Sequence, residues 1–221
     1  MQFASLRERA EKDWQRIRQH PMVVAIGQGT LERSVFRTFI QQDALYLQDF
    51  SRVLARLASL APDIAAARLL LAHADTVFQV EGELHQSAAR DLGILEGQLG
   101  RGPKGLITKA YGDHMVRQVM QGAFLPALAA VLPCYWTYAE IGTELYGLGL
   151  PEDKLLRDWI LVYSGDEYRR AVDEIVSLFD RLAGASGKDE DAQVEEVFDW
   201  SMIYEWLFWE QAYNGQQFFV N

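Results

Sequence analysis

The sequence predicts an all-α fold, a single-domain helical bundle over residues 1–221. Apolar residues recur at three- and four-residue spacing along most of the chain, and no stretch shows the strict apolar–polar alternation of a half-buried strand. Hydrophobic residues make up 49% of the chain, enough to fill one well-buried core. No repeat, linker or low-complexity tract divides the sequence. In such a bundle a pocket is expected between helices, in the core.

The breakers in the first part of the chain define the first two helices. An amphipathic helix is expected over 2–19, because His20-Pro21 stops the pattern. A second is expected over 32–60, where apolar side chains keep the helical period until Pro62.

The remaining elements follow in the same way. An alanine- and leucine-rich helix is expected over 63–92, and residues 93–105, in which five glycines and Pro103 gather, form the clearest loop. We therefore expect seven or eight helices, the later ones covering 106–121, 125–148, 152–183 and 191–217.

Charge and cysteine content limit the class of protein. The formal net charge is −10, and an acidic surface repels phosphate backbones and anionic lipids, so no nucleic-acid or membrane partner is expected. No apolar run suggests a membrane span, and the first residues predict an amphipathic helix instead of a signal peptide. One cysteine leaves no intrachain disulfide, which suits a reducing compartment. These features favour a cytoplasmic protein.

Cys134 is that cysteine, in the run Leu132-Pro133-Cys134-Tyr135-Trp136. If Pro133 opens a helix, Cys134 lies beside backbone N–H groups without intrahelical partners, whose positive end lowers the pKa of a thiol. Most lone cysteines, however, are small buried apolar residues. Position alone leaves both interpretations open, nucleophile and core residue.

Asp43 and Tyr46 lie three residues apart and therefore share a face of the expected second helix. Phe39 and Phe50 lie on the same face, so Asp43 is aligned with core residues. A charged, unpaired aspartate costs several kcal/mol when buried. Asp43 is therefore either a functional carboxylate or a boundary residue that reaches solvent or caps a neighbouring helix.

Three further tyrosines lie in mostly apolar segments. Tyr138 follows Cys134 by one helical turn, and Tyr111 and Tyr163 lie on two other expected helices. Each alone is compatible with a core tyrosine that makes one hydrogen bond. Together they indicate a pocket with a flat apolar interior and several hydroxyl groups.

The last expected helix places Glu205 and Phe208 on one face, among large aromatic residues. Burial beside apolar rings raises the pKa of a carboxyl group, which suits a general acid near neutral pH. The alternative is a solvated glutamate on the polar side of the helix. Because aromatic residues surround Glu205 almost continuously, periodicity does not decide between the two.

A metal site was also considered. Glu81 and His85 share a helix face and Glu140 lies on another helix, the beginning of a carboxylate-rich di-iron site. Such a site needs several more ligands on facing helices, and the chain has four histidines, none in its last two helices. No metal site is expected.

Taken in order, these residues resemble the TenA/thiaminase II family, all-helical proteins of the haem-oxygenase-like fold. The resemblance runs from near residue 5 to about residue 215, and the cysteine is similar to that of the cysteine-containing branch, as opposed to the glutamate branch. The ordered series carries it: Gln42-Asp43 with Tyr46, Tyr111, Pro133-Cys134-Tyr135-Trp136 with Tyr138 and Gly142, Trp159 with Tyr163, and Glu205 with Phe208-Trp209-Glu210.

The resemblance implies an aminopyrimidine aminohydrolase, a hydrolase of thiamin salvage. Such an enzyme converts 4-amino-5-aminomethyl-2-methylpyrimidine into the 5-hydroxymethyl pyrimidine and ammonia, and thiamin into the same pyrimidine and the thiazole alcohol. The expected partner is the small pyrimidine substrate, without cofactor or metal. The resemblance also implies a homotetramer.

Residue roles follow from the same resemblance. Cys134 would add to the pyrimidine ring, and Glu205 would supply the proton for the leaving group. Asp43 would hydrogen-bond the amidine edge of the ring, which comprises the amino group and the adjacent nitrogen.

The aromatic residues would complete this site. Tyr138 and Tyr163 would contact other ring atoms, and Phe208 would form a wall against which the ring stacks. Tyr46 and Tyr111 would lie near the sulfur and favour its thiolate by hydrogen bonding.

Two rival functions remain. A di-iron oxidase could use the same haem-oxygenase-like fold with a different site, and it would contain iron. A non-catalytic regulatory or ligand-binding protein could keep the fold without the reaction, although a pure binder has no use for a nucleophile.

Overall fold

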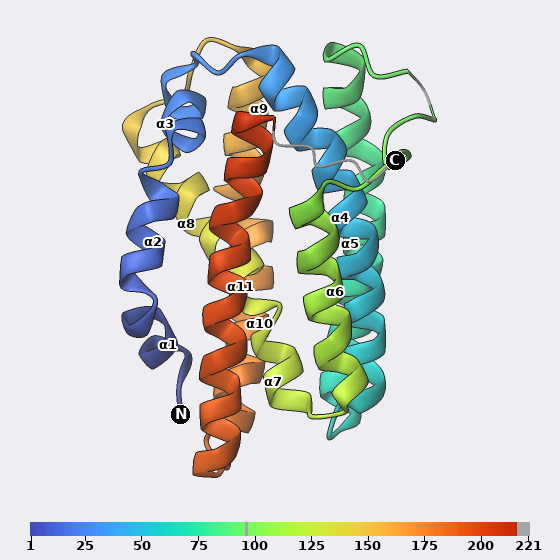
Figure 1. Cartoon of the computed structure of the whole chain (residues 1–221), viewed down its shortest axis with the longest axis vertical. Coiled ribbons are helices and arrows are strands. Elements are labelled where there is room, and N and C mark those ends of the chain that lie inside the picture. Colours follow the sequence, from blue (N-terminus) through green and yellow to red (C-terminus); the bar gives the residue numbers. More distant parts are fainter. Residues whose placement is uncertain (96, 216–221) are drawn as a thin grey trace. The chain divides into compact units, whose positions relative to one another are not determined.

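The computed structural model describes residues 1–95 and 97–215, without the side chains of 78–88. Every regular element in these residues is a helix, which confirms the all-α prediction (Figure 1). The helices are α1 (Phe3–Arg9), α2 (Glu11–Arg18), α3 (Pro21–Gln28), α4 (Arg33–Leu60), α5 (Ile64–Asp91), α6 (Leu106–Gln121), α7 (Phe124–Ala129), α8 (Leu132–Leu148), α9 (Lys154–Tyr163), α10 (Asp166–Ala183) and α11 (Lys188–Asn214).

The chain divides into two compact units, each made of two separate stretches of sequence. The first unit comprises Met1–Leu31 and Leu125–Trp206, and the second comprises Glu32–Phe124 and Leu207–Asn221. Helix α11 runs through the boundary and so contributes residues to both. The single domain over 1–221 stays a prediction.

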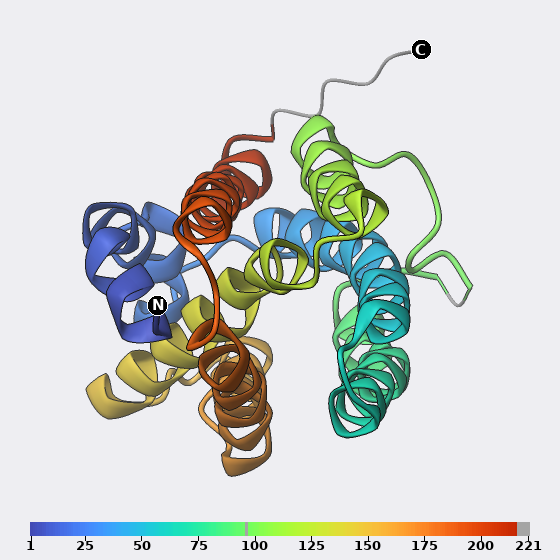
Figure 2. The same ribbon diagram turned by 90° about the horizontal axis from the view of Figure 1, so that it is seen from below.

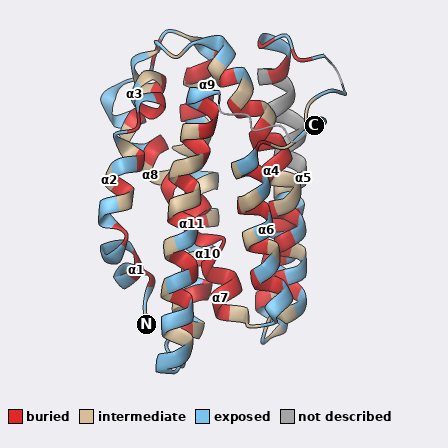
Figure 3. Cartoon of the chain, viewed as in Figure 1, coloured by how far each residue is buried: buried red, intermediate tan, exposed pale blue. Residues whose placement is uncertain are grey.

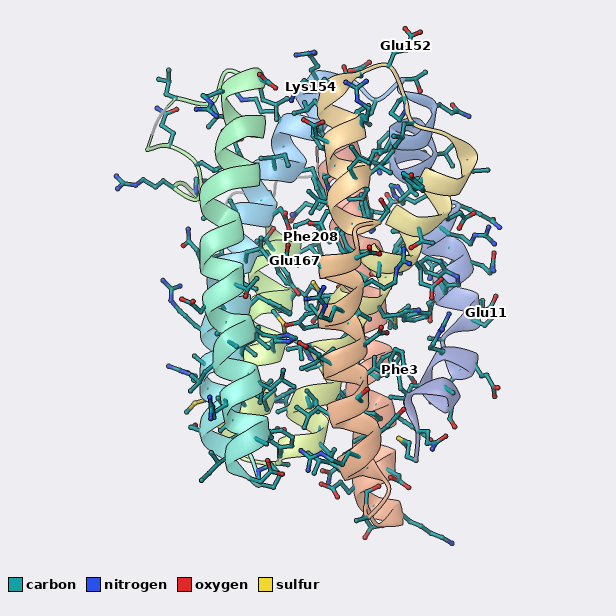
Figure 4. The ribbon with its side chains drawn as sticks, turned by 180° about the vertical axis from the view of Figure 1, so that it is seen from behind. Phe3, Glu11, Glu152, Lys154, Glu167 and Phe208 are labelled. Atoms are coloured by element: carbon teal, nitrogen blue, oxygen red, sulfur yellow. The ribbon has the colours of Figure 1, made fainter. Side chains whose placement is uncertain are left out.

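Helix α8 organises the first unit, where it packs against α3, α9 and α10 (Figures 1 and 2). Every residue of 125–138 is buried, as the colouring of α7 and the start of α8 shows (Figure 3). Phe3, labelled in Figure 4, packs edge-on against Trp136 at 5.9 Å and Phe198 at 6.1 Å. These contacts tie the start of the chain to the core of the unit.

Helix α4 organises the second unit, because it packs along both α5 and α6 (Figure 1). Its buried face follows the spacing that the sequence shows, with apolar side chains at three- and four-residue intervals. The residues of this face that are at most 2% exposed are Phe36, Phe39, Ile40, Ala44, Phe50, Ser51, Val53, Leu54 and Leu57.

Helix α3 was not predicted, because His20-Pro21 has the pattern of a helix stop. The imidazole Nδ1 of His20 accepts a hydrogen bond from the Met22 backbone N–H at 3.1 Å and so caps this helix. Pro21 occupies the first turn, and Gly29 ends the helix in the left-handed conformation with φ 69°. His20 and Pro21 therefore begin a new helix directly after α2 ends at Arg18 with Gln19 as its C-cap.

Three expected helices are divided, among them the one that separates into α9 and α10. The helix expected over 152–183 ends at Tyr163, and Gly165 is the N-cap of α10, with Asp166 and Glu167 in its first turn. The helix expected over 2–19 breaks at Ala10, and that over 125–148 breaks between α7 and α8. The last helix begins at Lys188 and ends at Asn214, and residues 216–217 of its expected range lie outside the described residues.

One segment is long and apolar enough to cross a membrane, by length and composition alone. It covers Phe124–Leu148, which includes α7 and α8, and most of it lies inside the fold. The sequence analysis expected no such segment. Because the buried core helix of a water-soluble protein passes the same test, we interpret α8 as the core helix of its unit.

Candidate active site

Cys134 lies in the first turn of α8, two residues after the helix begins. Pro133 also lies in this turn, so the helix opens where the proline predicted. The first four backbone N–H groups of a helix have no intrahelical partner, and the helix dipole favours an anion beside them. Cys134 is buried, with 9% of its surface exposed. The helix dipole therefore stabilises a thiolate at this position relative to the neutral thiol.

A cluster of aromatic rings lies on the side of α8 that faces α9 and α10. The ring of Tyr163 is at its centre, 5.0 Å from Tyr138, 4.7 Å from Trp159 and 4.9 Å from Tyr168 between ring centroids. Tyr138 is one turn after Cys134 and buried. The structure thus brings Tyr138 and Tyr163 together, as a shared pocket wall requires.

Tyr168 links this cluster to Cys134, and the sequence analysis missed it. Its hydroxyl donates a hydrogen bond to the backbone carbonyl of Cys134 at 3.3 Å. Burial raises the pKa of the Tyr168 phenol well above its usual range, and the charges of Cys134 and Glu205 act in the same direction. Tyr168 therefore stays protonated at neutral pH and remains a hydrogen-bond donor.

Tyr135 is a second phenol that the sequence analysis did not select. Burial raises its pKa well above the usual range, and the charges of Cys134 and Glu174 contribute. It directly follows Cys134, and its position in an aromatic run gave no signal that separates it from an ordinary core tyrosine.

Glu205 is buried in the first unit, with 2% of its surface exposed. The interpretation as a solvated surface glutamate is therefore wrong. Its charge contributes to the raised pKa of the Tyr168 phenol, as does that of Cys134, although burial of the phenol is the main cause. Glu205 is therefore a buried carboxyl group of the unit that also holds Cys134.

The second unit holds the other predicted residues. Tyr46 packs against Tyr111 at 5.0 Å and against Phe208 at 5.7 Å, and its hydroxyl donates to Met115 Sδ at 3.7 Å. Phe208, labelled in Figure 4, also meets Phe39 edge-on at 5.9 Å. The structure therefore brings Tyr46, Tyr111 and Phe208 together.

Asp43 lies one turn before Tyr46 on α4 and is 4% exposed. The interpretation as a boundary residue that reaches solvent is therefore wrong, whereas a functional carboxylate and a residue that caps a neighbouring helix both fit this burial. A buried carboxylate costs several kcal/mol unless other groups compensate its charge. Asp43 is thus placed as a functional carboxylate requires.

A buried amide network, also missed, joins α4, α6 and α11 within the second unit. Gln42 Oε1 accepts hydrogen bonds from the Gly105 backbone N–H at 2.8 Å and from Thr108 Oγ1 at 2.7 Å. Gln211 Oε1 accepts from the Ile107 backbone N–H at 2.8 Å, and its Nε2 donates to Thr108 Oγ1 at 2.8 Å. The two glutamines thus satisfy backbone donors at the start of α6. Glutamines and a threonine give no sequence signal for such a network.

Replacing Gln211 by leucine is expected to destabilise the protein. The substitution keeps a similar volume but leaves the Ile107 N–H without its acceptor, and a buried unsatisfied donor costs about 1–3 kcal/mol. We expect the free energy of unfolding in urea to fall by about 2 kcal/mol. Gln193→Leu, at an exposed position of the same helix, is the matched control. Equal stability of the two variants would contradict a structural role for the network.

Comparison with known protein families decides the identity of the fold. Residues 7–215 match the TENA/THI-4/PQQC family. The chain belongs to this family. The resemblance that the ordered residues indicate is thereby confirmed.

A relative within this family confirms the prediction of a hydrolase. The protein from Halalkalibacterium halodurans named aminopyrimidine aminohydrolase is 34% identical over 219 residues, which cover 99% of this chain and 98% of that protein. The match therefore extends over both proteins almost completely.

Solved structures confirm the fold. A TenA homologue from P. horikoshii OT3 superposes with a TM-score of 0.88 at 30% identity, over 96% of this chain and 98% of that one. A domain from Shewanella denitrificans described as having a heme oxygenase-like fold gives a TM-score of 0.74 at 10% identity, over 98% and 94%. The second likeness concerns the fold alone, and it agrees with the predicted haem-oxygenase-like type.

The di-iron alternative for this family member depended on three residues. The side chains of Glu81 and His85 lie outside the described residues. Glu140 forms an ion pair with Arg7 at 2.8 Å and accepts a hydrogen bond from Trp136 Nε1 at 3.3 Å. Among the side chains that the structure describes, no three His, Cys, Asp or Glu residues form a group that could hold a metal ion.

Proposed function

We propose that this chain is an aminopyrimidine aminohydrolase that converts 4-amino-5-aminomethyl-2-methylpyrimidine and water into the 5-hydroxymethyl pyrimidine and ammonia. The observation that carries the proposal is that the first unit buries both Cys134, in the first turn of α8, and the Glu205 carboxyl group. A nucleophile and a proton donor in a buried site are the two groups that this displacement requires. The name of the relative from Halalkalibacterium halodurans supports the substrate class.

In the first step, the Cys134 thiolate forms a bond to a carbon of the pyrimidine ring, and the ring loses its aromaticity. Electrons pushed into the ring then expel the amine from the exocyclic methylene carbon. Glu205 gives its proton to that amine, so the group leaves as neutral ammonia. The C–N bond breaks, and an electrophilic methylene remains attached to the ring.

In the second step, water adds to the methylene carbon and gives up a proton to the Glu205 carboxylate. The bond between sulfur and ring carbon breaks, aromaticity returns, and the thiolate is restored. The sum consumes one water and releases one ammonia, with no net oxidation or reduction. The reaction therefore asks for no cofactor or metal.

The other predicted residues would bind the pyrimidine ring and favour the thiolate form of Cys134. We propose that Asp43 accepts hydrogen bonds from the amidine edge and that Phe208 forms the stacking wall. Tyr138 and Tyr163 would contact other ring atoms. The buried positions of Asp43 and Phe208 support these roles, as does the ring contact between the two tyrosines.

Tyr46 and Tyr111 would favour the thiolate through their hydroxyl groups. Their support is the ring contact at 5.0 Å that holds the two phenols together on α4 and α6.

Thiamin is the second proposed substrate, which yields the same pyrimidine and the thiazole alcohol. Its leaving nitrogen already carries a positive charge and departs as a neutral thiazole. Both reactions return a reusable pyrimidine, so we assign the protein to thiamin salvage in the cytoplasm. The acidic charge and the single cysteine support this assignment.

We also propose a homotetramer. Several large apolar side chains remain exposed in the isolated chain, as expected of surfaces that other copies cover. Light scattering after size exclusion measures the assembly, and a monomeric mass would contradict the proposal. The side chains most exposed among these are Ile64, Met120, Leu95 and Leu148.

The function is tested by ammonia release from the aminomethyl pyrimidine and by thiazole release from thiamin, with the purified protein. We expect both products, and the hydroxymethyl pyrimidine in equal amount. A protein inactive on both substrates would overturn the proposed function. Iron in the preparation, with activity lost on its removal, would favour the di-iron oxidase instead.

Asp43→Asn is expected to weaken substrate use. Asparagine keeps the shape of the side chain but loses the charge, and one of its terminal groups is a donor that faces the donors of the amidine edge. A hydrogen bond to a charged group contributes about 1.5–3 kcal/mol, so kcat/KM should fall about 10- to 100-fold. Steady-state ammonia release measures this. An unchanged kcat/KM would remove Asp43 from the binding site.

A further inference from the structure

Gly142 lies in the middle of α8, two turns after Cys134, where glycine is an unfavourable residue. Glycine in a helix interior costs about 0.5–1 kcal/mol relative to alanine. Gly142 does not have a positive φ, so backbone conformation gives no reason for glycine here. The reason must lie in what surrounds it.

A neighbouring segment of backbone occupies the space that a side chain would need. A Cβ atom on Gly142 would lie 2.5 Å from the carbonyl carbon of Tyr163, 2.7 Å from the backbone nitrogen of Ser164 and 2.7 Å from Tyr163 Cβ. Real Cβ atoms essentially never come within 3.0 Å of other heavy atoms, and two of these three atoms are backbone. The segment would have to move by roughly 1 Å to reach ordinary contact.

The segment in question is the corner where α9 ends and α10 begins. The Ser164 backbone N–H donates to the Ile160 carbonyl at 2.9 Å, and the Gly165 backbone N–H donates to the Val162 carbonyl at 3.2 Å. These bonds make the corner a compact turn, so it moves as a unit. Glycine at 142 therefore sets how closely the whole corner approaches α8.

The corner carries side chains that reach back toward Cys134. The Tyr163 ring packs against Tyr138 at 5.0 Å and against Tyr168 at 4.9 Å. The Tyr168 hydroxyl donates to the Cys134 carbonyl at 3.3 Å. The corner is thus fixed to α8 at two points, by close approach at Gly142 and by a hydrogen bond at Cys134.

We propose that Gly142 is a positioning residue for the pyrimidine site. By admitting the corner close to α8, it places Tyr163 against Tyr138 at the distance that the pyrimidine ring requires. The inference rests on the proposed function, because it assigns these two tyrosines to the ring.

Gly142→Ala tests the proposal, with Gly147→Ala as its matched control. Gly147 lies on the same helix and has no atom within 4 Å of its would-be Cβ, so alanine there meets open space. Both substitutions add one methyl group and raise helix propensity equally. Only Gly142→Ala places its methyl group against the corner between α9 and α10.

We expect Gly142→Ala to raise KM for the aminomethyl pyrimidine, and Kd for the hydroxymethyl product, at least about tenfold while kcat stays within about threefold. Ring contacts act in both the ground state and the transition state, so their loss appears in KM. A variant that is merely destabilised has fewer active molecules, which lowers kcat and leaves KM and product Kd unchanged. Gly147→Ala should match the wild type in all three quantities.

Product binding is measured by calorimetry well below the unfolding temperature of each variant. Equal Kd for wild type and Gly142→Ala would overturn the inference and leave the proposed function intact. A wild type that neither binds the product nor releases ammonia would overturn the proposed function, and the inference with it.

A second variant covers the case in which Gly142→Ala does not fold. Tyr168→Phe removes the hydroxyl group that bonds to the Cys134 carbonyl, and it adds no atoms that could clash. We expect it to raise product Kd about fivefold, a loss comparable to one hydrogen bond. If Gly142→Ala is unfolded and Tyr168→Phe binds product like the wild type, the corner does not position the site and the proposal fails.

Discussion

Cys134→Ser is expected to lower kcat/KM for the aminomethyl pyrimidine by at least about 10³-fold. A serine hydroxyl has nearly the shape of a thiol but stays protonated at neutral pH. In the first turn of α8, by contrast, the helix dipole stabilises the thiolate form of a cysteine. Because the proposed reaction begins with attack of the anion on the ring, loss of the thiolate blocks every later step.

The single cysteine permits a second measurement on the same side chain. Iodoacetamide can alkylate a thiol only at Cys134, so mass spectrometry reports the reactivity of this one residue. We expect one added group per chain in the wild type, protection by the hydroxymethyl product, and loss of activity in proportion to labelling. Cys134→Ser should keep the helical circular dichroism spectrum and the unfolding temperature. Full activity in this variant would overturn covalent catalysis.

The class of fold could be predicted because helical periodicity is a local property, but several boundaries could not. The signals around His20 belong to two helices at once, since α2 ends at Arg18 and His20, two residues later, caps α3. The break after Tyr163 has a usable signal, Gly165 followed by two acidic residues, but the apolar period continues across it. When the apolar spacing continues on both sides of a turn, the spacing gives no sign that the helix is interrupted.

Because the turn after Tyr163 was not predicted, the contact between Tyr168 and Tyr163 was not predicted either. On a continuous helix, Tyr163 and Tyr168 lie five residues apart and point to different sides. The corner reorients α10, and the two rings meet at 4.9 Å. By contrast, Cys134 and Tyr138 belong to one uninterrupted helix, so their shared face could be predicted from spacing alone.

Burial was the other quantity that spacing could not provide. Asp43 and Glu205 each had a solvated interpretation, because a helix pattern rich in aromatic residues has no clear polar face. Their exposed fractions of 4% and 2% come from the packing of other helices around them. The amide network of Gln42, Thr108 and Gln211 is likewise formed by three helices that are distant in sequence.

Glu205→Gln is expected to lower kcat for the aminomethyl pyrimidine by about 10²- to 10⁴-fold, the usual contribution of a general acid. Glutamine keeps the size and the hydrogen-bonding capacity of the side chain, but it has no proton to transfer. Since Glu205 is almost fully buried, nearby water does not readily replace it. KM should change little, because the ring contacts are untouched. Steady-state ammonia release measures both quantities.

Comparison of two leaving groups separates proton transfer from a structural role of Glu205. The amine must gain a proton to leave as ammonia, whereas the thiazolium nitrogen of thiamin has no lone pair to protonate and leaves as a neutral thiazole. Glu205→Gln should therefore reduce hydrolysis of the aminomethyl pyrimidine at least about tenfold more than cleavage of thiamin. Glu210→Gln, on the same helix and only partly buried, is the control and should leave both rates unchanged. Equal losses on the two substrates would mean that Glu205 acts on the water or on the fold, and not on the departing amine.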